Sequence, residues 1–302
     1  MRQLLLICAA FIVLLSSCAS LTKSQIETVN HFARISKNFS AYPSKILTGL
    51  ADLSLSEGVY FSNSLDSVKL HIDDLNGLYE SKKDVYKSSA KADITFKIID
   101  KYAQALLLIS SDKHAADLDS QTVNFGTGLD NLITTYNTMP DVKPVQSGLG
   151  GVVGSIVLAG GKQLIRTKQA KAIQEFVPKA DTLISVMTSN LLEFLTSTNI
   201  DLLIKNEERN IQRNYKSFLS QRKATIQNER DYLGFKADID NIKILRDQTI
   251  EATKNLRKAH LKLVNEIKEK KDLKEVIAEL QTLYEDISNV KSTISALNTV
   301  KN

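Results

Sequence analysis

The chain has no tryptophan, only four prolines and only two cysteines among its 302 residues. Both cysteines, Cys8 and Cys18, lie near the start of the sequence, so the rest of the chain must be stabilised by packing without an internal disulfide. The low proline content, with glycine concentrated in one segment, favours long helices. The formal net charge of +5 is small for this length. Basic and acidic residues alternate along the chain, which argues against nucleic-acid binding.

The residue groupings that enzymes and metal sites need are also missing. No Gly-x-Ser-x-Gly elbow is present, and the acidic doublets Asp73-Asp74 and Glu207-Glu208 are typical of solvated helix faces. No histidine lies three or four positions from another, so no helix face carries paired metal ligands. We expect all four at ordinary surface or helix-end positions; they are His31, His71, His114 and His260. We therefore expect no enzyme activity, no metal, no cofactor and no small-molecule substrate.

The first residues have the pattern of an export signal. Met1-Arg2 precedes an apolar run from Leu4 to Leu15, which ends in Leu15-Ser16-Ser17-Cys18. The run is shorter than the roughly 20 residues of a membrane span and is typical of a secretory signal peptide. Its end resembles the lipobox of bacterial lipoproteins. The resemblance implies that residues 1–17 are removed and that Cys18, acylated with fatty acids such as palmitate, becomes the first residue of the mature chain.

A lipid anchor at Cys18 predicts a location as well. Ala19 follows the cysteine where the enterobacterial sorting pattern places aspartate in proteins kept at the inner membrane, so the outer membrane is favoured, on its periplasmic side. Residues 18–24 then form a short tether, and the membrane contact is lipid. Two alternatives remain open: a plain cleaved signal in which Cys18 is incidental, and an uncleaved N-terminal anchor.

Helical periodicity organises the mature chain. Residues 25–139 form an N-terminal helical region with separate apolar stripes over 65–79 and 94–109. The prolines at 140 and 144 mark a linker over 140–147. Residues 148–302 follow as a glycine-rich helix and a set of long helices, packed in one domain with 25–139.

The C-terminal third predicts a helical hairpin. An apolar stripe from Ile242 to Leu263 is followed by a polar break at 269–272 and then by a second stripe. In the second stripe, apolar residues recur every three and four positions, the pattern of a coiled-coil seam; they are Leu273, Val276, Leu280, Leu283, Ile287, Val290, Ile294 and Leu297. We predict an all-α, elongated up-and-down bundle with a C-terminal antiparallel coiled-coil hairpin, although the seam could instead dimerise between copies. Before it, Pro178 is expected in the first turn of a helix reaching Phe218.

The glycine-rich segment matches neither nucleotide-binding pattern. Val153, Ile156 and Gln163 stand where the dinucleotide and phosphate loops require Gly, Gly and Ser or Thr. Its glycines suit either a buried helix that a neighbouring backbone approaches closely or a membrane-inserting helix over 144–165, similar in design to helical pore-formers; they are Gly148, Gly150, Gly151, Gly154, Gly160 and Gly161.

A basic stretch from Lys254 to Lys271 suits either a solvated hairpin face or contact with anionic lipid or an acidic partner. Together these features predict a structural or protein-interaction lipoprotein of the outer membrane, which presents its bundle to an envelope protein. The alternative is a membrane-active protein that uses the glycine-rich helix.

Overall fold

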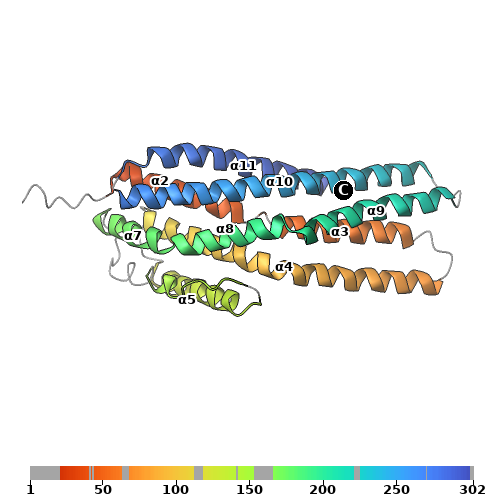
Figure 1. Cartoon of the computed structure of the whole chain (residues 1–302), viewed down its shortest axis with the longest axis horizontal. Helices are drawn as coiled ribbons and strands as arrows, with labels where there is room; N and C mark the ends of the chain where they lie inside the picture. The colour runs from red at the N-terminus through yellow and green to blue at the C-terminus, as the bar shows by residue number, and fades with distance from the viewer. Residues whose placement is uncertain are drawn as a thin grey trace, which may run out of the picture.

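The fold is all-α. The computed structural model describes residues 21–40, 42, 44–62, 68–111, 118–140, 142–152, 166–220, 225–269 and 271–299, and this part of the chain contains no strand. The helices are α2 (Lys23–Ser40), α3 (Ser44–Ser62), α4 (Val68–Ser110), α5 (Leu118–Asn137), α7 (Arg166–Lys179), α8 (Asp181–Leu195), α9 (Thr198–Ser220), α10 (Ile226–Lys268) and α11 (Lys274–Thr299). They form an elongated bundle (Figure 1), so the predicted helical bundle is confirmed.

The bundle has two halves joined by two continuous helices. The turn half, named for the α10–α11 connection at its end, contains α2, α7, α8 and most of α11, whereas the far half contains α3 and α9. Among the described helices, α4 and α10 pack in both halves (Figure 1). Each has 43 residues, which corresponds to about 65 Å at 1.5 Å per residue. The smaller α5 packs beside α4 in the turn half.

Two helix breaks lie at the same level between the halves. Tyr42, between α2 and α3, lines a crevice with Asp93 and Phe96 of α4. Ser197, between α8 and α9, lines another with Ala92 and Thr95 of α4. The described chain is therefore interrupted twice beside one short stretch of α4.

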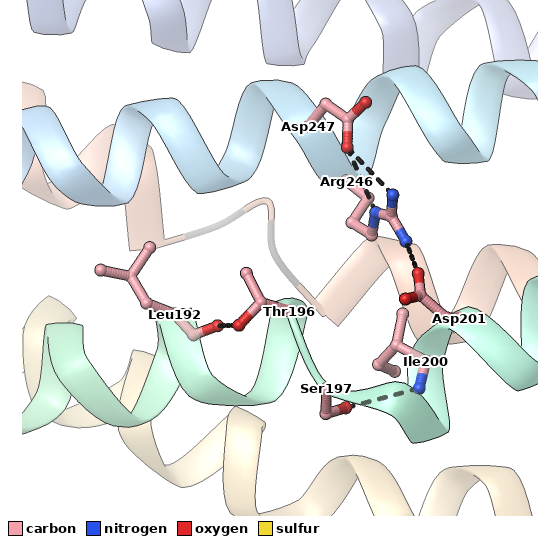
Figure 2. Close-up of polar contacts among 7 residues, drawn as sticks. All are labelled: Leu192, Thr196, Ser197, Ile200, Asp201, Arg246 and Asp247. Carbon is pink, nitrogen blue, oxygen red and sulfur yellow. Dashed lines mark hydrogen bonds and ion pairs between the residues drawn. The ribbon is translucent and has the colours of Figure 1, made fainter.

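An ion pair between α10 and α9 lies beside the break between α8 and α9. The amide of Ile200 lies 3.4 Å from the Ser197 hydroxyl, a weak cap for the start of α9. Arg246 of α10, whose side chain is 21% exposed, pairs with Asp201 in the first turn of α9 and lies 3.2 Å from Asp247 (Figure 2). The guanidinium thus ties the beginning of α9 to the continuous helix beside it.

The turn end of the bundle carries both the start of α2 and the α10–α11 connection. Thr22 caps α2 reciprocally with Gln25: the Thr22 amide donates to Gln25 Oε1 at 2.6 Å and the Gln25 amide to Thr22 Oγ1 at 3.2 Å. The Gln25 amide group also donates to the carbonyl of Lys271 in the connection. Leu273 has φ 60°, unusual for a branched residue, and is fully buried.

Helices α10 and α11 run antiparallel. Lys258 pairs with Glu279 at 2.9 Å, Asn255 donates to Asp286 at 2.7 Å and Thr293 donates to Gln248 at 2.9 Å. In these three contacts the residue number decreases along α10 as it increases along α11. Six seam positions are buried and the last two are half-buried; they are Leu273, Val276, Leu280, Leu283, Ile287 and Val290, then Ile294 and Leu297. The seam is occupied by α10 of the same chain, while a supercoil in this pair stays a prediction.

Three expected helix boundaries are wrong. The stripes at 65–79 and 94–109 belong largely to one helix, α4, rather than to two. Pro178 lies in the last turn of α7 instead of the first turn of α8, where the missing N–H costs one hydrogen bond. The helix expected to reach Phe218 ends at Leu195, and α9 begins anew at Thr198.

Candidate functional site

The described part of the glycine-rich segment makes a close backbone contact with α5. A Cβ atom on Gly126 would lie 2.6 Å from the carbonyl oxygen of Gly150, and one on Gly150 would overlap the carbonyl oxygen of Gly126. Asp130 of α5 accepts from the Gly148 and Gly150 amides at 3.0 and 3.1 Å. Gly148 has φ +91°, which favours glycine. The contact is therefore specific to two glycines.

The other predicted positions in this segment are placed differently. A Cβ atom added to Gly151 would have no heavy atom within 4 Å, so no close neighbour requires glycine at this position. Gly154, Gly160 and Gly161 lie outside the described residues, as do Cys18 and His114. None of the helices that are described is both long enough and apolar enough to cross a bilayer.

The basic stretch on the hairpin is largely neutralised by its neighbours. Lys258 and Lys262 of α10 pair with Glu279 and Glu275 of α11, and Lys254 pairs with Glu251 at 2.7 Å. Apart from Glu279, which is 15% exposed, the partners are exposed, and such pairs add little individual stability. They support a solvated hairpin face more than a positive surface aimed at a lipid or an acidic partner.

A buried polar cluster joins α4, α8 and α10 inside the turn half. Tyr102 and His260 are 1% and 2% exposed, and the tyrosine oxygen lies 3.0 Å from His260 Nδ1. His260 Nε2 lies 3.7 Å from Asp181 Oδ1 and has no hydrogen-bond partner. Phe32 and Phe176 flank the two rings. The histidine expected at a surface or helix end is in the core.

Burial sets the protonation state of this cluster. It lowers the pKa of His260 from 6.5 to about 3, because the cation would lose its hydration. It also raises the pKa of Tyr102 well above 10, with the Asp181 charge adding to the effect. Both groups are neutral at pH 7 and enclosed by side chains. The arrangement resembles an acid–base relay in composition, yet its burial leaves a substrate no access, so we interpret it as structural.

A second polar cluster lies between α3 and α9 in the far half. Glu57 and Glu207 are 4% and 6% exposed. The amide group of Asn214 donates to Glu57 Oε1, whereas Glu207 Oε1 has no hydrogen-bond partner. The expected solvated doublet is therefore half wrong, because Glu207 faces the core while Glu208 faces outward and pairs with Lys243 at 3.2 Å.

Burial raises the pKa of both carboxyl groups. Desolvation raises the pKa of Glu57, and the Asn214 hydrogen bond and the charge of Arg213 partly offset this. Desolvation raises the pKa of Glu207 to about 7, and the nearby Glu57 charge raises it further while a Ser54 hydrogen bond opposes it. Glu207 therefore changes its protonation state near neutral pH. A signal existed in the sequence, since Glu207 and Asn214 continue the apolar stripe of Ile200, Ile204, Ile211 and Phe218.

A groove opens where α11 ends. It has a volume of about 570 Å³ and lies between α3, α10 and the last turns of α11. Its walls combine apolar residues such as Ile242 and Leu297 with charges of both signs, including Lys45 and Asp52. Within the described ranges, no three His, Cys, Asp or Glu side chains come together as metal ligands.

Comparisons with known proteins add no identification. No family model matches this chain, and neither the curated proteins nor the solved structures include a significantly similar one. The chain's own residues are therefore the basis for inferring its function.

Proposed function

We propose that this protein is a lipid-anchored scaffold of the bacterial outer membrane that presents a helical bundle to other envelope proteins. The observation that carries the proposal is the apolar run from Leu4 to Leu15 followed by Leu15-Ser16-Ser17-Cys18. Acylation of Cys18 with more than one chain would anchor the bundle stably. Ala19 favours the outer membrane.

The described fold is compatible with a bundle that is anchored at its turn end. Leu21 is 2% exposed, so the packed bundle begins three positions after Cys18. A lipid at Cys18 would hold the turn end near the bilayer and leave the far half extending away from it. The far half has exposed apolar side chains, among them Ile226 at 72% and Leu233 at 63%. A non-catalytic role is part of the proposal, and it accords with the enclosed polar clusters.

Two cysteine variants test the anchor. Mass spectrometry of the protein from purified envelopes should find Cys18 acylated and residues 1–17 absent. Cys18→Ala should abolish the acyl mass and release the bundle from the membrane fraction. Cys8→Ala is the matched control, because it changes a cysteine inside the apolar run and should leave acylation intact. An unmodified Cys18 in the mature protein would contradict the proposal.

In-cell crosslinking with mass spectrometry tests the scaffold role. A discrete envelope protein crosslinked to the anchored chain, and lost with Cys18→Ala, would support it. If neither an envelope protein nor another copy of the chain is crosslinked, the scaffold role is wrong, and dye leakage from liposomes would then test the membrane-active alternative.

A further inference from the structure

The outward side of α10 in the far half carries a regular stripe of exposed residues. The outer stripe consists of positions separated alternately by four and three residues; they are Ile226, Arg230, Leu233, Ala237, Asp240 and Ile244. All six are exposed, and Ile226, Leu233 and Ile244 are 72%, 63% and 48% exposed. The opposite side of the same segment, with Ile242 and Leu245, is buried in the bundle. This spacing is that of a seam between two helices, but here the partner helix is not part of the same described fold.

We infer that the outer stripe binds the outer stripe of a second copy of this chain, with the two α10 helices antiparallel about a two-fold axis beside Phe235. This register places Ile226 against Ile244 of the second copy and Leu233 against Ala237 of the second copy. It also places Arg230 against Asp240 of the second copy. Because the interface is isologous, each of these contacts occurs twice.

Charge selects the antiparallel direction. A parallel pairing would place Arg230 on Arg230 and Asp240 on Asp240 in the middle of the seam, which like charges oppose. The antiparallel register instead pairs opposite charges. On its flank Glu229 faces Lys243 of the second copy, which within its own chain also lies 3.2 Å from Glu208 and 3.4 Å from Asp240. Lys236 meets its own counterpart at the axis, which is unfavourable. Two of the three types of charged contact in this register therefore pair opposite charges.

The size of the stripe sets the expected strength. From Ile226 to Ile244 it covers about 27 Å of helix at 1.5 Å per residue. One helix pair of this length buries an area at the low end of specific interfaces, so association on the order of micromolar is expected. In this register the turn ends of the two copies point in opposite directions, so the pair joins chains that approach from opposite sides rather than copies that stand upright on one surface. The inference does not depend on acylation and extends beyond the proposed anchor.

Cysteine pairing tests the register directly. The full chain with Cys8→Ser and Cys18→Ser, purified in mild detergent, provides a background without thiols. Oxidation of a mixture of the Ile226→Cys and Ile244→Cys proteins should give a disulfide-linked heterodimer. Neither protein alone should crosslink, because Ile226 and its counterpart lie about 27 Å apart, beyond disulfide reach. Leu261→Cys and Ile277→Cys, exposed elsewhere, are controls that should crosslink with nothing.

A charge exchange tests the same register without cysteines. Arg230→Asp and Asp240→Arg should each weaken dimerisation on the order of tenfold in sedimentation velocity. The double variant should restore it. Arg230 and Asp240 lie about 15 Å apart along their own helix, so the rescue can act only between copies. Crosslinking of each cysteine variant with itself, a monomer at every concentration, or a double variant no better than the singles would overturn the inference.

Discussion

Tyr102 of α4 and His260 of α10 meet through a 3.0 Å hydrogen bond between the two helices that run through both halves of the bundle. Both side chains are almost completely buried. The bond satisfies His260 Nδ1, while Nε2 lies 3.7 Å from Asp181. This polar pair spans the core between α4 and α10 and fixes their relative axial position, because any axial slip of one helix would leave both groups unsatisfied in the core.

Removing the tyrosine oxygen should destabilise the bundle. Tyr102→Phe keeps the ring but leaves His260 Nδ1 without its partner, so the free energy of unfolding should fall by about 1–3 kcal/mol at pH 7. Urea denaturation followed by circular dichroism measures this. Tyr79→Phe, at a position 59% exposed, is the matched control and should change little. Equal stability of Tyr102→Phe and the wild type would mean that the bond contributes nothing.

Acid should weaken the fold through His260. Its pKa is lowered from 6.5 to about 3 in the folded chain, so the unfolded state binds the proton first as the pH falls. Stability from this group is complete above pH 6.5 and is lost progressively down to pH 3; at pH 5 the loss is about 2 kcal/mol. Urea unfolding at pH 7.5 and pH 5 should therefore show a smaller difference in His260→Gln than in the wild type. His31→Gln, at an exposed position, should keep the wild-type difference.

Glu207 should destabilise the fold at alkaline pH. The folded pKa is raised from 4.5 to about 7, so the destabilisation begins above pH 4.5 and is complete above pH 7. Glu207→Gln removes the buried charge and should stabilise the protein by up to about 3 kcal/mol at pH 8, with little change at pH 4. Its neighbour Glu208 provides the control, because Glu208→Gln removes only a partly exposed pair with Lys243. Thermal melts across this pH range measure the change in stability, and a pH-independent effect of Glu207→Gln would contradict the raised pKa of Glu207.

Two glycines on α5 should respond oppositely to alanine. Gly126→Ala places a methyl group 2.6 Å from the Gly150 carbonyl oxygen, and the required backbone shift should cost about 1–3 kcal/mol. Gly128→Ala meets only Lys101 Cε, at 4.0 Å, so the better helix propensity of alanine should leave stability equal or up to about 1 kcal/mol higher. Comparison of the two melting temperatures gives the result. If both variants behave alike, the close contact does not operate in solution.

Burial was predicted best from the sequence where every position of a stripe is apolar. The seam from Leu273 to Leu297 is apolar throughout, and its first six positions are buried in the bundle. The burial of Glu207 and His260 was not predicted, because the polar type of a single residue indicates a surface position. Their positions, in step with apolar neighbours on α9 and α10, carried the information that they face the core.

Helix continuity was harder to predict. The segment between the two stripes of α4, around 81–91, is rich in serine and lysine and has no apolar periodicity. Such residues neither require nor prevent a helix, and tertiary packing at both ends makes α4 continuous. Conversely, the apolar pattern of the sequence shows no clear break at Thr196 and Ser197, where α8 ends. Short polar residues there favour a cap, and Asp201 offers a partner to Arg246 that only the fold brings near.

The level at which α2–α3 and α8–α9 are both broken has a mechanical consequence. A sideways load on the far half is transmitted past this level chiefly by two long rods, α4 and α10, because α11 passes it with only its last turns; the Arg246–Asp201 pair braces one side. Two parallel rods resist bending in the plane that contains both and yield more easily across it. The far half should therefore swing chiefly in one direction, as a stiff strip flexes, while its distance from the turn end stays nearly constant.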